Sequence, residues 1–142
     1  MLKFNAEKHE YTLNGHPLIS VTTLLGKHGL SVDYSAVPIK TLSDKADFGN
    51  QVHKSIEHYL KGYSVDFRYK DYVQSFKDLM DKNGFMVTLS EKKVHNDIVA
   101  GTVDLVANKD GKNILLDIKT TYKLHKDVVA WQLSLYKDLL KT

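Results

Sequence analysis

The sequence predicts an α/β fold, in which α-helices flank a central mixed β-sheet. Residues 85–119 read as three consecutive strands, two helical patterns precede them, and one helical pattern follows them. This order of helix, helix, three strands and helix is typical of a sandwich around a mixed sheet. With 142 residues, the chain is expected to form one domain that spans residues 1–142.

The N-terminal part of the chain predicts three short strands and one short helix. Alternating apolar residues favour the strands, and Asn14-Gly15 predicts a turn between the second and the third. Ser20 or Thr22 could cap the helix that follows, and Gly29 would end it. Residues 31–44 carry weak signals and are expected to be irregular or a short helix. The expected strands are residues 2–5, 9–13 and 16–19.

Three longer helices follow from apolar residues at helical spacing. Phe48, Val52 and Ile56 recur on one face of the first of them, which Gly62 would end. Asn83-Gly84 would stop the second. The expected helices are residues 47–61, 69–81 and 126–141, and the expected strands between the last two are residues 85–95, 98–107 and 113–119.

The hairpin between the last two strands is expected to bring two carboxylates together. Asp110-Gly111 is a strong signal for a two-residue turn. If these residues form the turn, Lys109 faces Lys112, and counting outward places Asp104 opposite Asp117. Like charges directly opposite each other destabilise a sheet, so a cation is expected between the two acids.

One further step along the hairpin places Lys119 opposite Thr102, on the face of both acids. Magnesium takes oxygen ligands, usually one or two carboxylates plus substrate phosphate. The backbone carbonyl of Ile118 could supply a third oxygen. Two acids, one amine and a hard cation indicate a metal-dependent phosphodiesterase. The alternative is a diagonal salt bridge between Asp104 and Lys119 on a solvated face, with Asp117 as an ordinary surface acid.

Lys119 could act in two ways. It can orient the attacking water and offset the charge that builds on the phosphate. Whether it also removes the proton of that water stays open at this point, because nearby carboxylates favour its charged form and burial favours its neutral form. A divalent ion acidifies water by itself, which makes a lysine base unnecessary.

Four further residues are candidates, and each of them also has a purely structural interpretation. His53 follows Gly49 by one helical turn and could be a metal ligand, which would favour manganese as well as magnesium, or an ordinary surface or core histidine. Glu91 falls opposite Thr102 if Asn96-Asp97 is a tight turn. It could then steady Lys119 or bind a second metal, or it could form a cross-strand ion pair near an edge. Gln132 and Tyr136 lie four residues apart and therefore share one helix face. The pattern by itself indicates only a polar pair at the boundary of a helix.

Composition narrows the class of protein. The chain has no cysteine, which excludes disulfides, thiolate zinc sites and cysteine-ligated iron–sulfur clusters and makes an intracellular compartment the default. We expect no secretory signal and no membrane span. The net charge of +3 identifies no partner, but Arg68 is the only arginine. Lysine suits phosphates better than base edges, which favours contact with a nucleic-acid backbone; a compositional bias is the alternative.

Four short motifs follow one another along the chain: Gly49-x-x-x-His53, Gly101-Thr102-Val103-Asp104, Asp117-Ile118-Lys119 and Gln132-x-x-x-Tyr136. In their order and rough spacing they resemble the motifs of RecB-like nucleases, which belong to the PD-(D/E)XK phosphodiesterase superfamily. The resemblance extends from about residue 11 to residue 136. Residues 18–23 also resemble the Ser-Val-Thr stretch of phage exonucleases similar to the mitochondrial genome maintenance exonuclease.

The resemblance implies a restriction-endonuclease-like fold and magnesium- or manganese-dependent hydrolysis of DNA. It makes His53, Asp104 and Asp117 metal ligands and Lys119 the catalytic lysine. Gln132 and Tyr136 would contact DNA or support the site, and Ser20 and Thr22 would touch a phosphate. Val103 stands where the superfamily name expects proline, and the missing cysteines disfavour the iron–sulfur branch.

We therefore expect a deoxyribonuclease, and specifically an exonuclease acting on DNA ends or single strands in phage recombination, replication or repair. Its setting would be the cytoplasm of a bacterial host, with phage recombination or replication proteins as possible partners. The alternatives are a structure-selective endonuclease such as a junction resolvase, or a DNA-binding or assembly module without turnover. Lysines expected to grip the DNA backbone are Lys92, Lys93, Lys123 and Lys126. Aromatic residues that could stack on bases are Tyr34, Tyr122 and Trp131, with burial favoured for Trp131.

Overall fold

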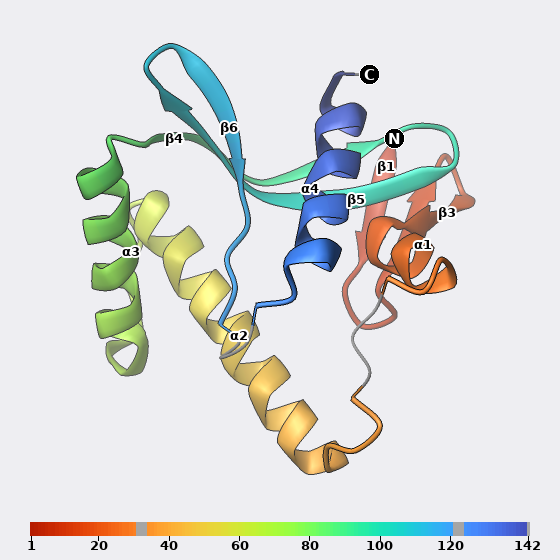
Figure 1. The fold of residues 1–142 in the computed structure, drawn as a ribbon, viewed down its shortest axis with the longest axis horizontal. Coiled ribbons are helices and arrows are strands. Elements are labelled where there is room, and N and C mark those ends of the chain that lie inside the picture. Colours follow the sequence, from red (N-terminus) through yellow and green to blue (C-terminus); the bar gives the residue numbers. More distant parts are fainter. Residues whose placement is uncertain (31–33, 121–123, 142) are drawn as a thin grey trace. The chain divides into compact units, whose positions relative to one another are not determined.

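The computed structural model describes residues 1–30, 34–120 and 124–141. Within these residues it contains six strands, four α-helices and one short 3-10 helix, η1 (Phe67–Tyr69) (Figure 1). The strands are β1 (Leu2–Asn5), β2 (Glu10–Leu13), β3 (His16–Ser20), β4 (Met86–His95), β5 (Val99–Lys109) and β6 (Lys112–Leu116). The helices are α1 (Val21–Lys27), α2 (Ile39–Leu60), α3 (Lys70–Asn83) and α4 (Lys126–Lys141).

The strands form one mixed sheet in the order β1-β2-β3-β5-β4, and β6 pairs with β5. The β3–β5 pair is parallel, whereas β1–β2, β2–β3 and β5–β6 are antiparallel. The structure therefore confirms an α/β protein with a mixed sheet. Among the described helices, none is long and apolar enough to cross a membrane.

The chain divides into two compact units. The first unit comprises Met1–Val32, Glu91–Asp104 and His125–Thr142, and the second comprises Asp33–Ser90 and Leu105–Leu124. Strands β4 and β5 each contribute residues to both units.

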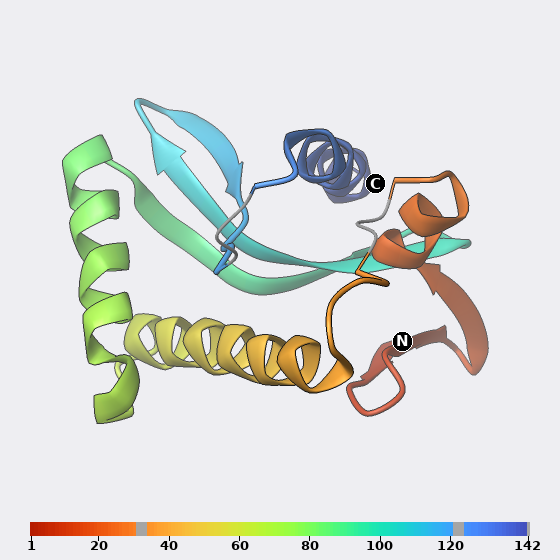
Figure 2. The same ribbon diagram turned by 60° about the horizontal axis from the view of Figure 1, so that its bottom comes forward.

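In the first unit, the N-terminal strands form the predicted meander. Asn14 and Gly15 both have positive φ angles, of 51° and 83°, as the tight turn between paired Leu13 and His16 requires. Ser20 ends β3 and caps α1, because its side chain accepts a hydrogen bond from the Thr23 amide. Helices α1 and α4 lie next to each other (Figure 2).

In the second unit, α2 and α3 pack together around an apolar core. The apolar stripe of each helix faces the other, which is the arrangement that their helical periodicity predicts. Helix α3 ends at Gly84, whose φ of 68° gives the left-handed turn that stops the helix. The buried members of the core are Val52, Ile56, Val73, Phe76, Met80 and Leu105.

Helix α2 begins at Ile39, eight residues earlier than the expected start at residue 47. The prediction was wrong here because the first turns of α2 bury little, as the 86% exposure of Ile39 shows. Without an apolar stripe, those residues carry no periodicity to recognise. Pro38 occupies the N-cap position of α2, where proline is well tolerated because it lies at the start of the helix.

Candidate metal centre

The β5–β6 hairpin has the predicted turn. Lys109 pairs with Lys112, and Asp110 and Gly111 have φ angles of 52° and 79°, as a tight hairpin turn requires. The register then runs without interruption to the pair Leu105 and Leu116. The sequence therefore predicted both the turn and the alignment of the two strands.

The second strand of this hairpin is shorter than expected. Strand β6 ends at Leu116, so Asp117, Ile118 and Lys119 follow the strand and do not belong to it. The expected rungs between Asp104 and Asp117 and between Thr102 and Lys119 lie beyond the last pair of the ladder. The prediction of a strand through residue 119 was wrong, since local composition does not show where strand pairing stops.

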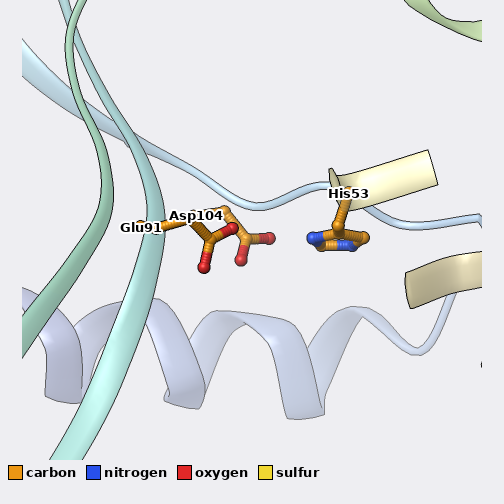
Figure 3. Close-up of side chains that lie close together, drawn as sticks. All are labelled: His53, Glu91 and Asp104. Atoms are coloured by element: carbon orange, nitrogen blue, oxygen red, sulfur yellow. The ribbon is translucent and has the colours of Figure 1, made fainter. Parts of the chain in front are cut away.

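In the first unit, Glu91 and Asp104 offer two carboxylates at one place. An oxygen of Glu91 lies within 4.8 Å of an oxygen of Asp104, and both residues are partly buried (Figure 3). Two ionised carboxylates at this distance repel each other unless a proton or a cation lies nearby. This close pair of acids is therefore a natural site for a positive ion.

The position of Glu91 differs from the expected one opposite Thr102. The Asn96 amide donates to the Val99 carbonyl at 2.9 Å, so the tight turn falls one residue later than Asn96-Asp97. The Asn96 side chain also accepts hydrogen bonds from the amides of Ile98 and Val99 and so fixes this turn. The Glu91 carboxylate lies next to that of Asp104.

In the second unit, His53 of α2 holds the segment that follows β6. Its Nε2 lies 2.8 Å from the Ile118 carbonyl, which can only accept, so Nε2 carries the proton. Burial lowers the pKa of His53, although the Ile118 hydrogen bond and the Asp117 charge oppose this. His53 is then neutral near pH 7. The Ile118 carbonyl, expected as a metal ligand, accepts this hydrogen bond.

Asp117 and Lys119 form an ion pair in the same unit. Lys119 Nζ lies 2.8 Å from Asp117 Oδ2, with side-chain exposures of 36% and 7%. The same Oδ2 is buried and has no hydrogen-bond partner among the described residues, because the lysine contact does not have hydrogen-bond geometry. Asp117 is therefore no surface acid, and its ion-pair partner is Lys119.

Gly49 marks the close approach that the sequence predicted. A Cβ atom at Gly49 would lie 3.0 Å from the Thr120 hydroxyl oxygen. The small residue on α2 thus makes room for the chain just after Lys119. Together, Gly49 and His53 place this stretch of irregular backbone against the helix.

The two acids are the candidate metal ligands of the first unit. Glu91 and Asp104 each offer one carboxylate oxygen, and these oxygens lie within 4.8 Å of each other (Figure 3). His53 belongs to the second unit and is a candidate ligand there. Carboxylate oxygens suit magnesium, and an imidazole nitrogen suits manganese.

Gln132 and Tyr136 are buried in the first unit. Gln132 Nε2 donates to the Tyr136 hydroxyl at 3.1 Å. A Cβ atom at Gly101 would lie 2.5 Å from Tyr136 Cε1, so the ring packs directly on the backbone of β5. Alternation along the strand puts Asp104 on the opposite face from Gly101. The pair therefore packs on the face of β5 opposite to the one that carries Asp104.

The other residues expected to contact DNA differ in where the structure places them. The Ser20 hydroxyl lies 2.8 Å from the Thr23 hydroxyl and 3.3 Å from that of Thr22, and it caps α1. Trp131 is 55% exposed, so the expected burial was wrong, and Tyr34 is 44% exposed. Lys92, Lys93 and Lys126 are exposed. Tyr122 and Lys123 lie outside the described residues.

Tyr11 is a residue that the sequence did not single out. Its side chain is buried, and its hydroxyl lies 2.8 Å from the Thr102 hydroxyl, which is 91 residues away along the chain. No local sequence pattern around Tyr11 predicts such a contact. Only the pairing of β2, β3 and β5 brings the two residues together.

Comparison with protein-family models, with curated protein sequences and with solved structures found no match to this chain. The resemblance to RecB-like nucleases therefore rests on the motifs and on their placement.

Proposed function

We propose that this protein is a magnesium- or manganese-dependent nuclease that hydrolyses phosphodiester bonds in DNA, and specifically an exonuclease. The observation that carries the proposal is the pair of Glu91 and Asp104 in the first unit, whose carboxylate oxygens lie within 4.8 Å of each other. Two close carboxylates are donors that such ions bind in proteins.

The second unit adds groups that suit the same chemistry. Asp117 Oδ2 is buried without a hydrogen bond among the described residues, a state that costs free energy unless an ion or another charge compensates it. Lys119 lies 2.8 Å from this oxygen and remains partly exposed, so its ammonium group can also reach a ligand. We infer that the carboxylates of Glu91 and Asp104 hold the divalent ion.

A divalent ion held there would supply Lewis acidity toward a phosphate oxygen. The protein's own groups would do the rest. Lys119, whose Nζ lies 2.8 Å from Asp117 Oδ2, would neutralise the charge that builds on the phosphate. His53 would stay neutral because burial lowers its pKa, and its Nε2–H bond to Ile118 would keep the ring oriented.

DNA is proposed as the substrate because of the motif resemblance and the chemistry of the surface charge. Nearly all positive charge is carried by lysine, and Lys92, Lys93 and Lys126 are exposed. Lysine binds the phosphodiester backbone without reading the bases. Such binding suits an enzyme that degrades DNA of any sequence.

The direct test is digestion of end-labelled single-stranded and double-stranded DNA with Mg²⁺ or Mn²⁺, followed over time. We expect stepwise shortening from one end, no cleavage with excess chelator, and recovery when the ion is restored. Covalently closed circular DNA is the matched control, because an exonuclease leaves it intact. Cleavage of the circle would establish an endonuclease instead, and absence of metal-dependent cleavage of any DNA would leave a non-catalytic module.

A further inference from the structure

Tyr11 lies beside the two acids of the first unit but belongs to none of the motifs. Its side chain is 3% exposed, and its hydroxyl is 2.8 Å from the Thr102 hydroxyl. Thr102 precedes Asp104 by two residues on β5, so both side chains leave the same face of the strand. The phenol therefore reaches the face of the sheet from which Asp104 projects.

Glu91 is held in an unusual backbone conformation. Its φ of 49° falls in the left-handed region, although it lies within β4 and is not glycine. A conformation of this kind costs about 1–3 kcal/mol and persists only where the surroundings enforce it. An irregularity of this type in a strand also re-aims the side chain, here toward Asp104.

Tyr11 is close enough to Glu91 to be influenced by its charge. Burial raises the pKa of Tyr11 and the negative charge of Glu91 adds to this effect, whereas the Thr102 hydrogen bond opposes it. The phenol therefore keeps its proton near neutral pH. A neutral hydroxyl that is hydrogen-bonded to Thr102 can support β5 without adding a third negative charge near Glu91 and Asp104.

We propose that Tyr11 is a positioning residue for the cation site, where its hydrogen bond with Thr102 fixes β5 and keeps the Glu91 carboxylate beside that of Asp104. The proposal rests on the proposed function, since it assumes that these acids hold a divalent ion. Tyr11 itself touches neither the ion nor the DNA.

The chain offers a matched control on the opposite face of the same strand. Tyr136 is also buried, and its hydroxyl accepts a hydrogen bond from Gln132, but its ring packs on the Gly101 face of β5. Tyr11→Phe and Tyr136→Phe each remove one hydroxyl from a buried ring. Each variant loses one buried hydrogen bond, so a general effect on stability would lower the urea midpoint of both variants alike.

The test is a titration with Mn²⁺ alone, with free Mn²⁺ followed by its paramagnetic resonance signal, together with urea unfolding of each variant. We expect Tyr11→Phe to weaken Mn²⁺ binding on the order of 10-fold, as loss of a group that orients a ligand does. Thr102→Val should do the same, and the double variant should bind no worse than either single one. Tyr136→Phe should leave the Mn²⁺ affinity unchanged.

Equal Mn²⁺ affinity in Tyr11→Phe and the unaltered protein would overturn the proposal, as would equal losses in Tyr11→Phe and Tyr136→Phe. Failure of the proposed function looks different. If the unaltered protein binds Mn²⁺ but cleaves no DNA, and Tyr11→Phe binds Mn²⁺ more weakly, the positioning role of Tyr11 stands and the nuclease proposal fails. If the unaltered protein binds no Mn²⁺, both proposals fail.

Discussion

The two compact units hold their candidate ligands by different means. In the first unit, Glu91 and Asp104 project from paired strands, so backbone hydrogen bonds fix their positions. In the second, Asp117 and Ile118 follow the end of β6, and their support comes from α2. That support is the His53 hydrogen bond to the Ile118 carbonyl and the close approach of Thr120 to Gly49.

This difference indicates which changes the site can tolerate. Ligands on paired strands move only if the sheet itself moves, which costs stability. Ligands beyond a strand can shift when a single side-chain contact is lost, with little effect on the rest of the fold. Substitutions in the two units should therefore separate stability from activity.

The largest effect is expected from Asp117→Ala, which removes the buried carboxylate of the second unit. Metal-dependent cleavage should fall on the order of 10²–10³-fold or more, as with the loss of other groups that stabilise the transition state. The fold should stay intact, because the removed Oδ2 has no hydrogen bond among the described residues and its ion pair is partly exposed. Cleavage rates and thermal unfolding measure the two effects. Asp138→Ala, at an exposed position on α4, is the control; full cleavage by Asp117→Ala would refute the assignment.

Gly101→Ala tests the first unit, where paired strands fix the candidate ligands. The new Cβ would lie 2.5 Å from Tyr136 Cε1 and 3.1 Å from Val21 Cγ2, both in packed surroundings. We expect a loss of about 1–3 kcal/mol in the free energy of unfolding, measured in urea, as for other overpacked sites. Tyr136→Leu in the same chain should recover part of this loss. A Gly101→Ala variant as stable as the unaltered protein would mean that the ring moves aside freely.

Gly49→Ala tests the second unit, where the support comes from α2. Its Cβ would lie 3.0 Å from the Thr120 hydroxyl oxygen, a side-chain atom that can rotate or shift. Alanine also favours the helix by up to about 1 kcal/mol over glycine, so stability should change little. Cleavage and Mn²⁺ affinity should nevertheless decrease, because the chain next to Lys119 is displaced. If stability falls as far as in Gly101→Ala, the proposed difference between the two units does not hold.

The smallest expected effect is a dependence of stability on pH that arises from His53. Burial lowers the pKa of His53 below its ordinary value of 6.5. The unfolded chain therefore takes up a proton at a higher pH than the folded chain, and unfolding becomes easier as the pH falls through and below 6.5. Urea unfolding of the metal-free protein between neutral and mildly acidic pH should show this decrease, and His53→Gln should reduce its slope. Parallel curves for the two proteins would contradict it.

Elements with local signals were predictable from the sequence. The turn at Asp110-Gly111 and the register that follows it depend on the chemistry of two residues, and the structure has both. Helix α4 has the expected bounds, Lys126–Lys141, because its apolar residues recur at helical spacing over its whole length. In both cases, all the information lies within a short stretch of chain.

The candidate site was less predictable, because its geometry depends on details at the ends of elements. Strand β6 ends at Leu116, so Asp117 lies outside the ladder in which it was expected. The Asn96 side chain fixes a turn that differs from the expected one before Glu91's partner strand. The approach at Gly49 was foreseen, but not that Thr120 makes it. Tyr11 had no signal at all, because its partner Thr102 lies in a strand remote in sequence.

The division of the chain limits how the protein can be dissected. The boundary between the units crosses β4 between Ser90 and Glu91 and β5 between Asp104 and Leu105. Truncation at either point would leave strand edges without their hydrogen-bonding neighbours, and a fragment of residues 1–90 would lack all of β5. Neither half can therefore be produced as a self-sufficient module, so its contribution has to be measured by point substitution in the whole chain.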